Sequence, residues 1–144
     1  MNKTPPTISK PVIASPEGLQ LPSLPDLHVS VHIYIPITTA EMENVRLGWI
    51  PEEMDERWFI YVDEKDVAYI HRSWTGFCIY KIDFAPQQEG WAAVRMTANR
   101  NPEEYTNVNI EKDKDMVKTL LLQYLARKRP KPMARLIPYS SKQV

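Results

Sequence analysis

The chain of 144 residues has one cysteine, Cys78, four glycines and no formal net charge. A lone cysteine excludes an intramolecular disulfide, and no cluster of cysteine and histidine has the spacing of zinc ligands. The few glycines form no phosphate-binding loop. With 18 basic and 18 acidic residues, no overall field attracts nucleic acid or a membrane surface. The sequence therefore predicts neither a disulfide scaffold nor a metal or cofactor site.

Long hydrophobic runs are also missing. No stretch reaches the roughly 18 apolar residues that indicate a membrane-spanning helix. The opening residues, MNKTPPTISK, lack the apolar centre of a secretory signal. Together with the lone cysteine, these absences predict a cytoplasmic protein that does not enter a membrane. Hydrophobic residues still make up 43% of the chain, which suits one domain with a core of its own.

Proline and charge divide the chain into three parts. Six of the 13 prolines lie in residues 1–26, which predicts an extended or disordered arm. Residues 27–129 carry the regular patterns and are expected to form a single domain. Residues 130–144 end a basic stretch that begins at Arg127, and such a tail without interleaved aromatic residues does not favour nucleic acid as a partner. Residues 1–26 and 138–144 are expected to add little stability.

The pattern of the middle part predicts a sheet. Residues 28–37, HVSVHIYIPI, alternate polar and apolar side chains with the two-residue period of a half-buried strand. Short runs rich in aromatic and β-branched residues follow, separated by turn sequences. These runs are Arg57–Val62, Val67–Arg72, Phe77–Phe84 and Trp91–Ala98. The expected sheet is a four- to five-stranded antiparallel β-meander.

Two segments predict helices. TTAEMENVRLGWI follows the first strand, with an N-cap at Thr38 or Thr39 and a stop at Gly48. EKDKDMVKTLLLQYLARK, near the end of the chain, has one apolar helical face. That face consists of Val117, Leu120, Leu121, Tyr124 and Leu125. The expected fold class is therefore α+β, with the C-terminal amphipathic helix packed on one face of the sheet.

The turn at residues 73–76 sets the expected register of the central hairpin, because it would pair His71 with Cys78. The face expected under the helix then carries Val67, Tyr69, His71, Cys78, Tyr80, Ile82 and Phe84. The second face carries Ala68, Ile70, Arg72, Phe77, Ile79, Lys81 and Asp83, together with Phe59 and Tyr61. This second face needs cover from the first strand, the short helix or another subunit, so it is a candidate homo-oligomer surface. A one-residue bulge would invert these assignments.

The paired His71 and Cys78 are the only candidates for a catalytic role. An imidazole beside a thiol is what a cysteine nucleophile needs. However, Cys78 lies in mid-strand, where a thiol is usually an inert buried group, and no strand-to-helix turn supplies an oxyanion hole. The acidic stretches at residues 52–56 and 63–66 lack the spacing of a calcium loop and indicate solvated surface. No catalytic residue is predicted.

The turn sequence HRSWTG contains more than a bend requires. Thr75 and Gly76 suffice for the turn. Arg72 offers a planar fork for carboxylate or phosphate, and Trp74 exposes apolar surface unless it packs on the sheet or meets a ligand. One interpretation is structural, with Trp74 on the sheet end and Arg72 paired to an acid. The other is a binding site formed by Arg72, Ser73, Trp74, Asn99 and Arg100.

RWFIYV, AYIHRSWTGFCIYKIDF, ANRNPEEY and the leucine-rich final helix resemble a small, largely uncharacterised bacterial domain with the pattern W-F-I-Y, H-R-S-W-T-G, C-I-Y and N-R-x-P-E-x-Y. That domain is loosely associated with ADP-ribose-processing neighbours such as macro domains. The resemblance covers residues 56–125 and implies a shared fold without a catalytic role for any motif position. This chain departs from the pattern at Asn101, where an acid is expected, and in its two arms.

Two functions remain. The first is a non-catalytic binding or accessory module that recognises a protein partner or a small anionic ligand through the Arg72–Trp74 turn. The alternative is a small enzyme acting on a nucleotide-like, ADP-ribose-type substrate, with His71 as acid/base and Arg72 or Arg100 holding phosphate. Because nucleophile, glycine-rich and metal motifs are missing, the sequence favours the first. A pocket joining His71, Arg72, Trp74 and Arg100 would favour the enzyme.

Overall fold

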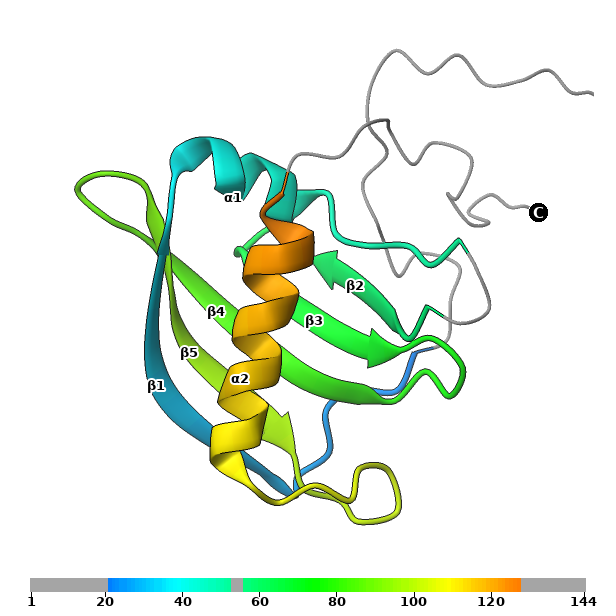
Figure 1. The fold of residues 1–144 in the computed structure, drawn as a ribbon. Coiled ribbons are helices and arrows are strands. Elements are labelled where there is room, and N and C mark those ends of the chain that lie inside the picture. The colour runs from blue at the N-terminus through cyan, green and yellow to red at the C-terminus, as the bar shows by residue number, and fades with distance from the viewer. Residues whose placement is uncertain (1–20, 53–55, 128–144) are drawn as a thin grey trace, which may run out of the picture.

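The computed structural model describes residues 21–52 and 56–127, which form a five-stranded antiparallel sheet with its helices on one face (Figure 1). The strand order is β1-β5-β4-β3-β2, so the predicted meander is present and the first strand joins its far edge. The elements are β1 His28–Ile37, α1 Thr39–Arg46, β2 Trp58–Val62, β3 Val67–Arg72, β4 Cys78–Pro86, β5 Trp91–Asn99, α2 Ile110–Leu120 and the π-helical turn η1 Leu121–Leu125. The predicted α+β class is confirmed.

The short helix α1 begins where the sequence predicts. The Thr38 side chain accepts a hydrogen bond from the Glu41 N–H, and the Glu41 carboxylate accepts one from the Thr38 N–H. This reciprocal pair satisfies two backbone donors that the first turn of a helix leaves without partners. Gly48, with a φ of 70°, then turns the chain back towards the sheet. Of the predicted arm and tail, residues 1–20 and 130–144 lie outside the described residues.

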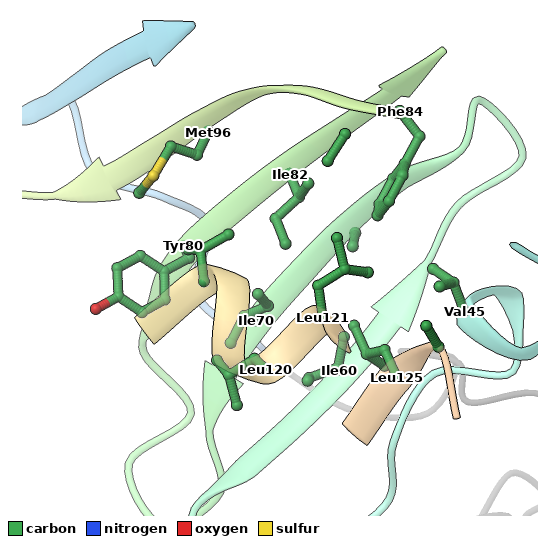
Figure 2. Packing of buried hydrophobic residues seen from close by; sticks show 14 of the residues in the cluster. Val45, Ile60, Ile70, Tyr80, Ile82, Phe84, Met96, Leu120, Leu121 and Leu125 are labelled. Carbon is green, nitrogen blue, oxygen red and sulfur yellow. The ribbon is translucent and has the colours of Figure 1, made fainter. Parts of the chain in front are cut away.

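The hydrophobic core lies between the sheet and the continuous helix formed by α2 and η1, as Figure 2 shows. The predicted apolar face is correct for Val117, Leu120, Leu121 and Leu125, which are buried. It is wrong for Tyr124, which is 44% exposed. The Ala126 N–H donates to the Leu121 carbonyl, five residues back, and this wider turn departs from the 3.6-residue period on which the prediction depended.

The β3–β4 hairpin has a bulge that inverts one strand relative to the prediction. His71 lies opposite Cys78 as expected, but Ile70 lies opposite Tyr80, so Ile79 is an extra residue. Ala68, Ile70 and Arg72 therefore lie on the helix-covered face, and Val67, Tyr69 and His71 lie on the second face. The prediction was wrong for these six residues of β3. Tyr80, Ile82 and Phe84 of β4 belong to the core beneath the helix, as expected.

The second face has a small apolar cluster of its own. Phe59 is 8% exposed and packs with Ile50, and the partly buried Leu21 and Tyr61 pack against this pair. The expected cover was the first strand, the short helix or another subunit, whereas the described contacts come from Ile50 and the segment that precedes β1. Tyr61 also stacks on Tyr69, with ring centroids 5.0 Å apart. Residue 21 of the predicted arm therefore contacts the domain.

Candidate functional site

A cleft of about 360 Å³ opens between β2 and the helix formed by α2 and η1. Figure 1 shows β2 beside this helix. Aromatic rings form much of its wall. The lining residues are Trp49, Glu56, Arg57, Trp58, Ile60, Met116, Thr119, Leu120 and Tyr124, and we call this site the aromatic cleft. A concave, mostly apolar surface with a few polar groups is the usual form of a binding site.

Trp49 is fixed in the cleft by contacts on several sides. Its backbone exchanges two hydrogen bonds with Ile60 of β2, at 2.8 and 2.9 Å. Its indole Nε1–H donates to the Glu56 carboxylate at 3.2 Å. Its ring meets Tyr124 edge to face, with centroids 5.5 Å apart and planes at 86°. The Tyr124 side chain that the helical period assigned to the core therefore lines the cleft instead.

Two of the predicted turn residues, Arg72 and Ser73, contact residues that line the cleft. The Ser73 hydroxyl donates to the Glu56 carbonyl at 2.7 Å, and the Ser73 N–H donates to the Arg57 carbonyl at 2.7 Å. The Arg72 guanidinium stacks over the Trp58 ring at 4.9 Å from its centroid. These contacts fix residues 56–58 at the start of β2, and all three of these residues line the cleft. Trp74 is 72% exposed and is not among the residues that line the cleft.

Arg72 does not match the structural interpretation of the turn, in which it pairs with an acid. Within the described residues it makes no ion pair with an acid, and its contact is the indole of Trp58. Its Nε is buried and has no hydrogen-bond partner in the same part of the chain. Stacking on an indole suits the weakly hydrated guanidinium plane. This contact orients the Trp58 ring that forms one wall of the cleft.

Asn99 and Arg100 are part of a structural network rather than of the cleft. Asn99 is fully buried, and its amide Nδ2 donates to the Cys78 carbonyl at 2.8 Å and to the Glu104 carboxylate at 2.9 Å. Its Oδ1 accepts from the Asn101 N–H at 2.7 Å. The Arg100 guanidinium donates to the Asp113 carboxylate. The NRNPEEY sequence therefore joins the end of β5 to α2.

The centre of this network is Asp113, which the sequence interpretation missed. Asp113 is fully buried, and its Oδ1 accepts from Tyr80 at 3.0 Å, Tyr105 at 2.9 Å and Asn107 at 2.8 Å. Burial raises the pKa values of both tyrosines, so they stay protonated as donors. The signal was in the helical period, because Asp113 precedes the buried Val117 by four residues.

His71 and Cys78 are adjacent as predicted, but their environments do not suit catalysis. His71 is 2% exposed on the second face, stacked on Tyr61 at 5.8 Å, with Nδ1 2.7 Å from the Gly76 carbonyl. Burial lowers the pKa of His71. Burial also raises the pKa of the Cys78 thiol to about 12, so at neutral pH the thiol is protonated and a weak nucleophile.

Within residues 21–52 and 56–127, no group of three or more His, Cys, Asp or Glu side chains is arranged to hold a metal ion. No helix of these residues is long and apolar enough to cross a membrane. Comparisons with protein families, curated proteins and solved structures find no match. The resemblance to a bacterial domain therefore stays a prediction, and the aromatic cleft is the feature from which function is inferred.

Proposed function

We propose that this protein is a non-catalytic binding module that recognises a protein partner by taking an apolar side chain into the aromatic cleft. The observation that carries the proposal is the wall of Trp49, Trp58 and Tyr124 around a cavity of about 360 Å³. Aromatic side chains offer a large contact area with few rotatable bonds, so little conformational entropy is lost when a partner binds. Such pockets take the anchor residues of protein interfaces.

The charges of the cleft favour a neutral anchor over a small anion. Glu56 and Arg57 both line the cleft, so its two ionic groups have opposite signs. Trp49 donates to the Glu56 carboxylate and thereby holds that negative charge inside the site. A phosphate or carboxylate would meet Glu56 as well as Arg57, and like charges repel. A peptide backbone can use both groups, one as acceptor and one as donor.

The Arg72–Trp74 turn enters this proposal as support for the cleft. Arg72 stacks on Trp58, and Ser73 binds the carbonyls of Glu56 and Arg57. These contacts account for an arginine and a serine at a turn whose bend needs only Thr75 and Gly76. The alternative enzyme gains no support, because neither His71 nor Arg100 is among the residues that line the cleft.

Selection of peptides by the full-length protein, from a displayed random library, tests the proposal. We expect the enriched peptides to share an aromatic or aliphatic residue. Thr119→Trp fills the cleft, because Thr119 lines it and is only half-buried. We expect this change to weaken peptide binding more than about tenfold, since a buried anchor contributes roughly 2 kcal/mol or more.

Lys112→Trp is the matched control, because Lys112 is exposed on the same helix and does not line the cleft. It should bind the selected peptides as the wild type does. If Thr119→Trp unfolds the protein, Tyr124→Ala removes one wall instead, at a residue that is already 44% exposed. Equal affinity of wild type, Thr119→Trp and Tyr124→Ala for the peptides would overturn the proposal.

A further inference from the structure

The strand β1 has an outer edge without a partner in the described part of the chain. It pairs with β5 on one side, and no strand of residues 21–52 and 56–127 pairs with the other. The ten residues of β1, HVSVHIYIPI, include no lysine, arginine, aspartate or glutamate. Proteins usually protect an edge strand with charged side chains, because its free N–H and C=O groups attract another strand. The edge of β1 lacks that protection.

The backbone groups that face outwards can be assigned from the hydrogen bond next to β1. The Arg100 N–H donates to the Leu27 carbonyl at 2.8 Å. Because alternate residues of a strand direct their backbone groups to opposite edges, Val29 and Val31 face β5. Ser30 and its neighbours two residues away then direct their N–H and C=O groups outwards. Regular pairing along the outer edge is confined to residues 28–32. A bulge follows His32, and Pro36 interrupts the end of the strand.

A groove of about 550 Å³ runs between the later part of β1 and α2. The α2 side of the groove presents charges of alternating sign, from Glu111, Lys114, Asp115 and Lys118. Lys114 contacts Glu111 at 3.5 Å, and both side chains remain accessible. Tyr34, which is 64% exposed, and Leu122, which is 36% exposed, add apolar surface. The four charged residues of α2 form a stripe with two acidic and two basic side chains.

We infer that β1 pairs antiparallel with β1 of a second copy of this chain, about a two-fold axis within residues 30–32. A two-fold axis inverts the order of the stripe on α2. The order of its charges, acidic, basic, acidic, basic, becomes the complementary order when it is inverted, so the stripes of two copies that meet side by side present unlike charges to each other. An isologous interface needs such self-complementarity. On the same face, Val29 and Val31 continue as an apolar row into the second copy.

This interface differs from the oligomer surface that the sequence suggested. The second sheet face was expected to need cover from the first strand, the short helix or another subunit, but Phe59 on that face is already packed against Ile50 and Leu21. The outer edge of β1 has no strand partner among the described residues, and backbone pairing is what the strand of a second copy supplies. The inference is independent of the peptide-binding proposal, because no residue of β1 lines the aromatic cleft.

Two oppositely charged variants of the full-length protein test the inference. The first combines Ser30→Lys with His32→Lys, and the second combines Ser30→Glu with His32→Glu. Both side chains are exposed on the second face. With the axis at any position within residues 30–32, each variant brings like charges together across the two copies. We expect the wild type to be a dimer in sedimentation or light-scattering measurements, and each variant alone to be a monomer.

Mixing the two variants should restore a dimer that contains one copy of each, because unlike charges then face each other. Gln87→Lys combined with Gln88→Lys, two exposed changes in the turn before β5, controls for added charge and should remain dimeric. A monomeric wild type would overturn the inference, including the case in which another segment of the same chain covers the edge. Dimers that persist in each variant alone, or a mixture that stays monomeric, would also overturn it.

Discussion

Asp113 and Asp115 show how differently two identical residues in one charged run are used. Both belong to EKDKD at the start of α2, yet Asp113 is fully buried and Asp115 is exposed. The helix directs Asp113 towards the core side, where Tyr80, Tyr105 and Arg100 donate to its carboxylate. A buried carboxylate persists only with such donors, because its desolvation is costly.

Asp113→Ala should lower the free energy of unfolding by about 3–5 kcal/mol, because it leaves the Arg100 guanidinium and two tyrosine hydroxyls without their acceptor. Chemical denaturation of the purified protein measures the change. Lys112→Ala, at an exposed position of the same charged run that lines neither the groove nor the cleft, is the control and should change stability by less than about 0.5 kcal/mol, as is usual for surface positions. Similar losses for the two variants would show that Asp113 is not the centre of the network.

His71 should make stability depend on pH. Burial lowers its pKa below the ordinary value of 6.5, so the unfolded chain takes up a proton at a higher pH than the folded protein. As pH falls below about 6.5, the free energy of unfolding should therefore decrease, until the pH reaches the lowered pKa of the folded state. The stability from this group is present above pH 6.5 and is lost on acidification.

His71→Asn tests this dependence, since its amide keeps a donor for the Gly76 carbonyl but does not titrate. Unfolding free energies measured between neutral and mildly acidic pH should fall less steeply for the variant than for the wild type. Equal slopes for the two proteins would mean that His71 does not account for the acid sensitivity. In an NMR titration of the folded wild type, the midpoint of His71 should lie below pH 6.5.

At the scale of elements, the helix at the end of the chain both closes the core and forms a wall of the cleft. α2 follows the regular period, and η1 widens by one residue, as the hydrogen bond from Ala126 to Leu121 shows. Leu121 and Leu125 stay buried in this turn, while Tyr124 meets Trp49. The π-helical turn thus separates core-forming from site-forming side chains within five residues.

Leu121 and its neighbour Leu122 provide a matched test of this element. Leu121 is fully buried and Leu122 is 36% exposed. Leu121→Ala should destabilise the fold by about 2–5 kcal/mol through lost burial and a cavity. Leu122→Ala should have a clearly smaller effect on the denaturation midpoint. A Leu122→Ala effect as large as that of Leu121→Ala would mean that the helix is rotated from the position described.

At the scale of the whole molecule, the chain before β1 is attached to the sheet. Leu21 packs against Ile50 and Phe59, and a side chain on Gly76 would lie 3.5 Å from Pro22. The segment thereby covers part of the second face, close to the turn whose other residues support the cleft. The expectation that residues 1–26 contribute little to stability therefore needs a test at Leu21.

Leu21→Ala should lower the free energy of unfolding by about 1 kcal/mol, because its side chain is partly rather than fully buried. Leu27→Ala serves as the control, since Leu27 is 59% exposed, and it should change stability by less than about 0.5 kcal/mol. Thermal or chemical denaturation of the full-length variants measures both. No loss on Leu21→Ala would support the original expectation for the whole arm.

Local patterns in the sequence suffice to place the helices and strands of this protein. Two-residue alternation identified β1, aromatic and β-branched runs identified β2–β5, and the N-cap candidates Thr38 and Thr39 marked the start of α1. These signals are local, because strand and helix periods and caps depend on residues within a few positions of one another. The α+β class and the position of the C-terminal helix followed from them.

The faces of the strands and the position of the site depend on tertiary packing. The extra residue Ile79 inverts β3, and the wider turn at Leu121–Leu125 moves Tyr124 from the core to the cleft. Each changes the period by one residue, and one residue is enough to exchange the two faces of a strand. Trp49, Trp58 and Tyr124 meet only because β2 and the C-terminal helix flank the same space. Contacts between distant segments depend on packing, which no local pattern encodes.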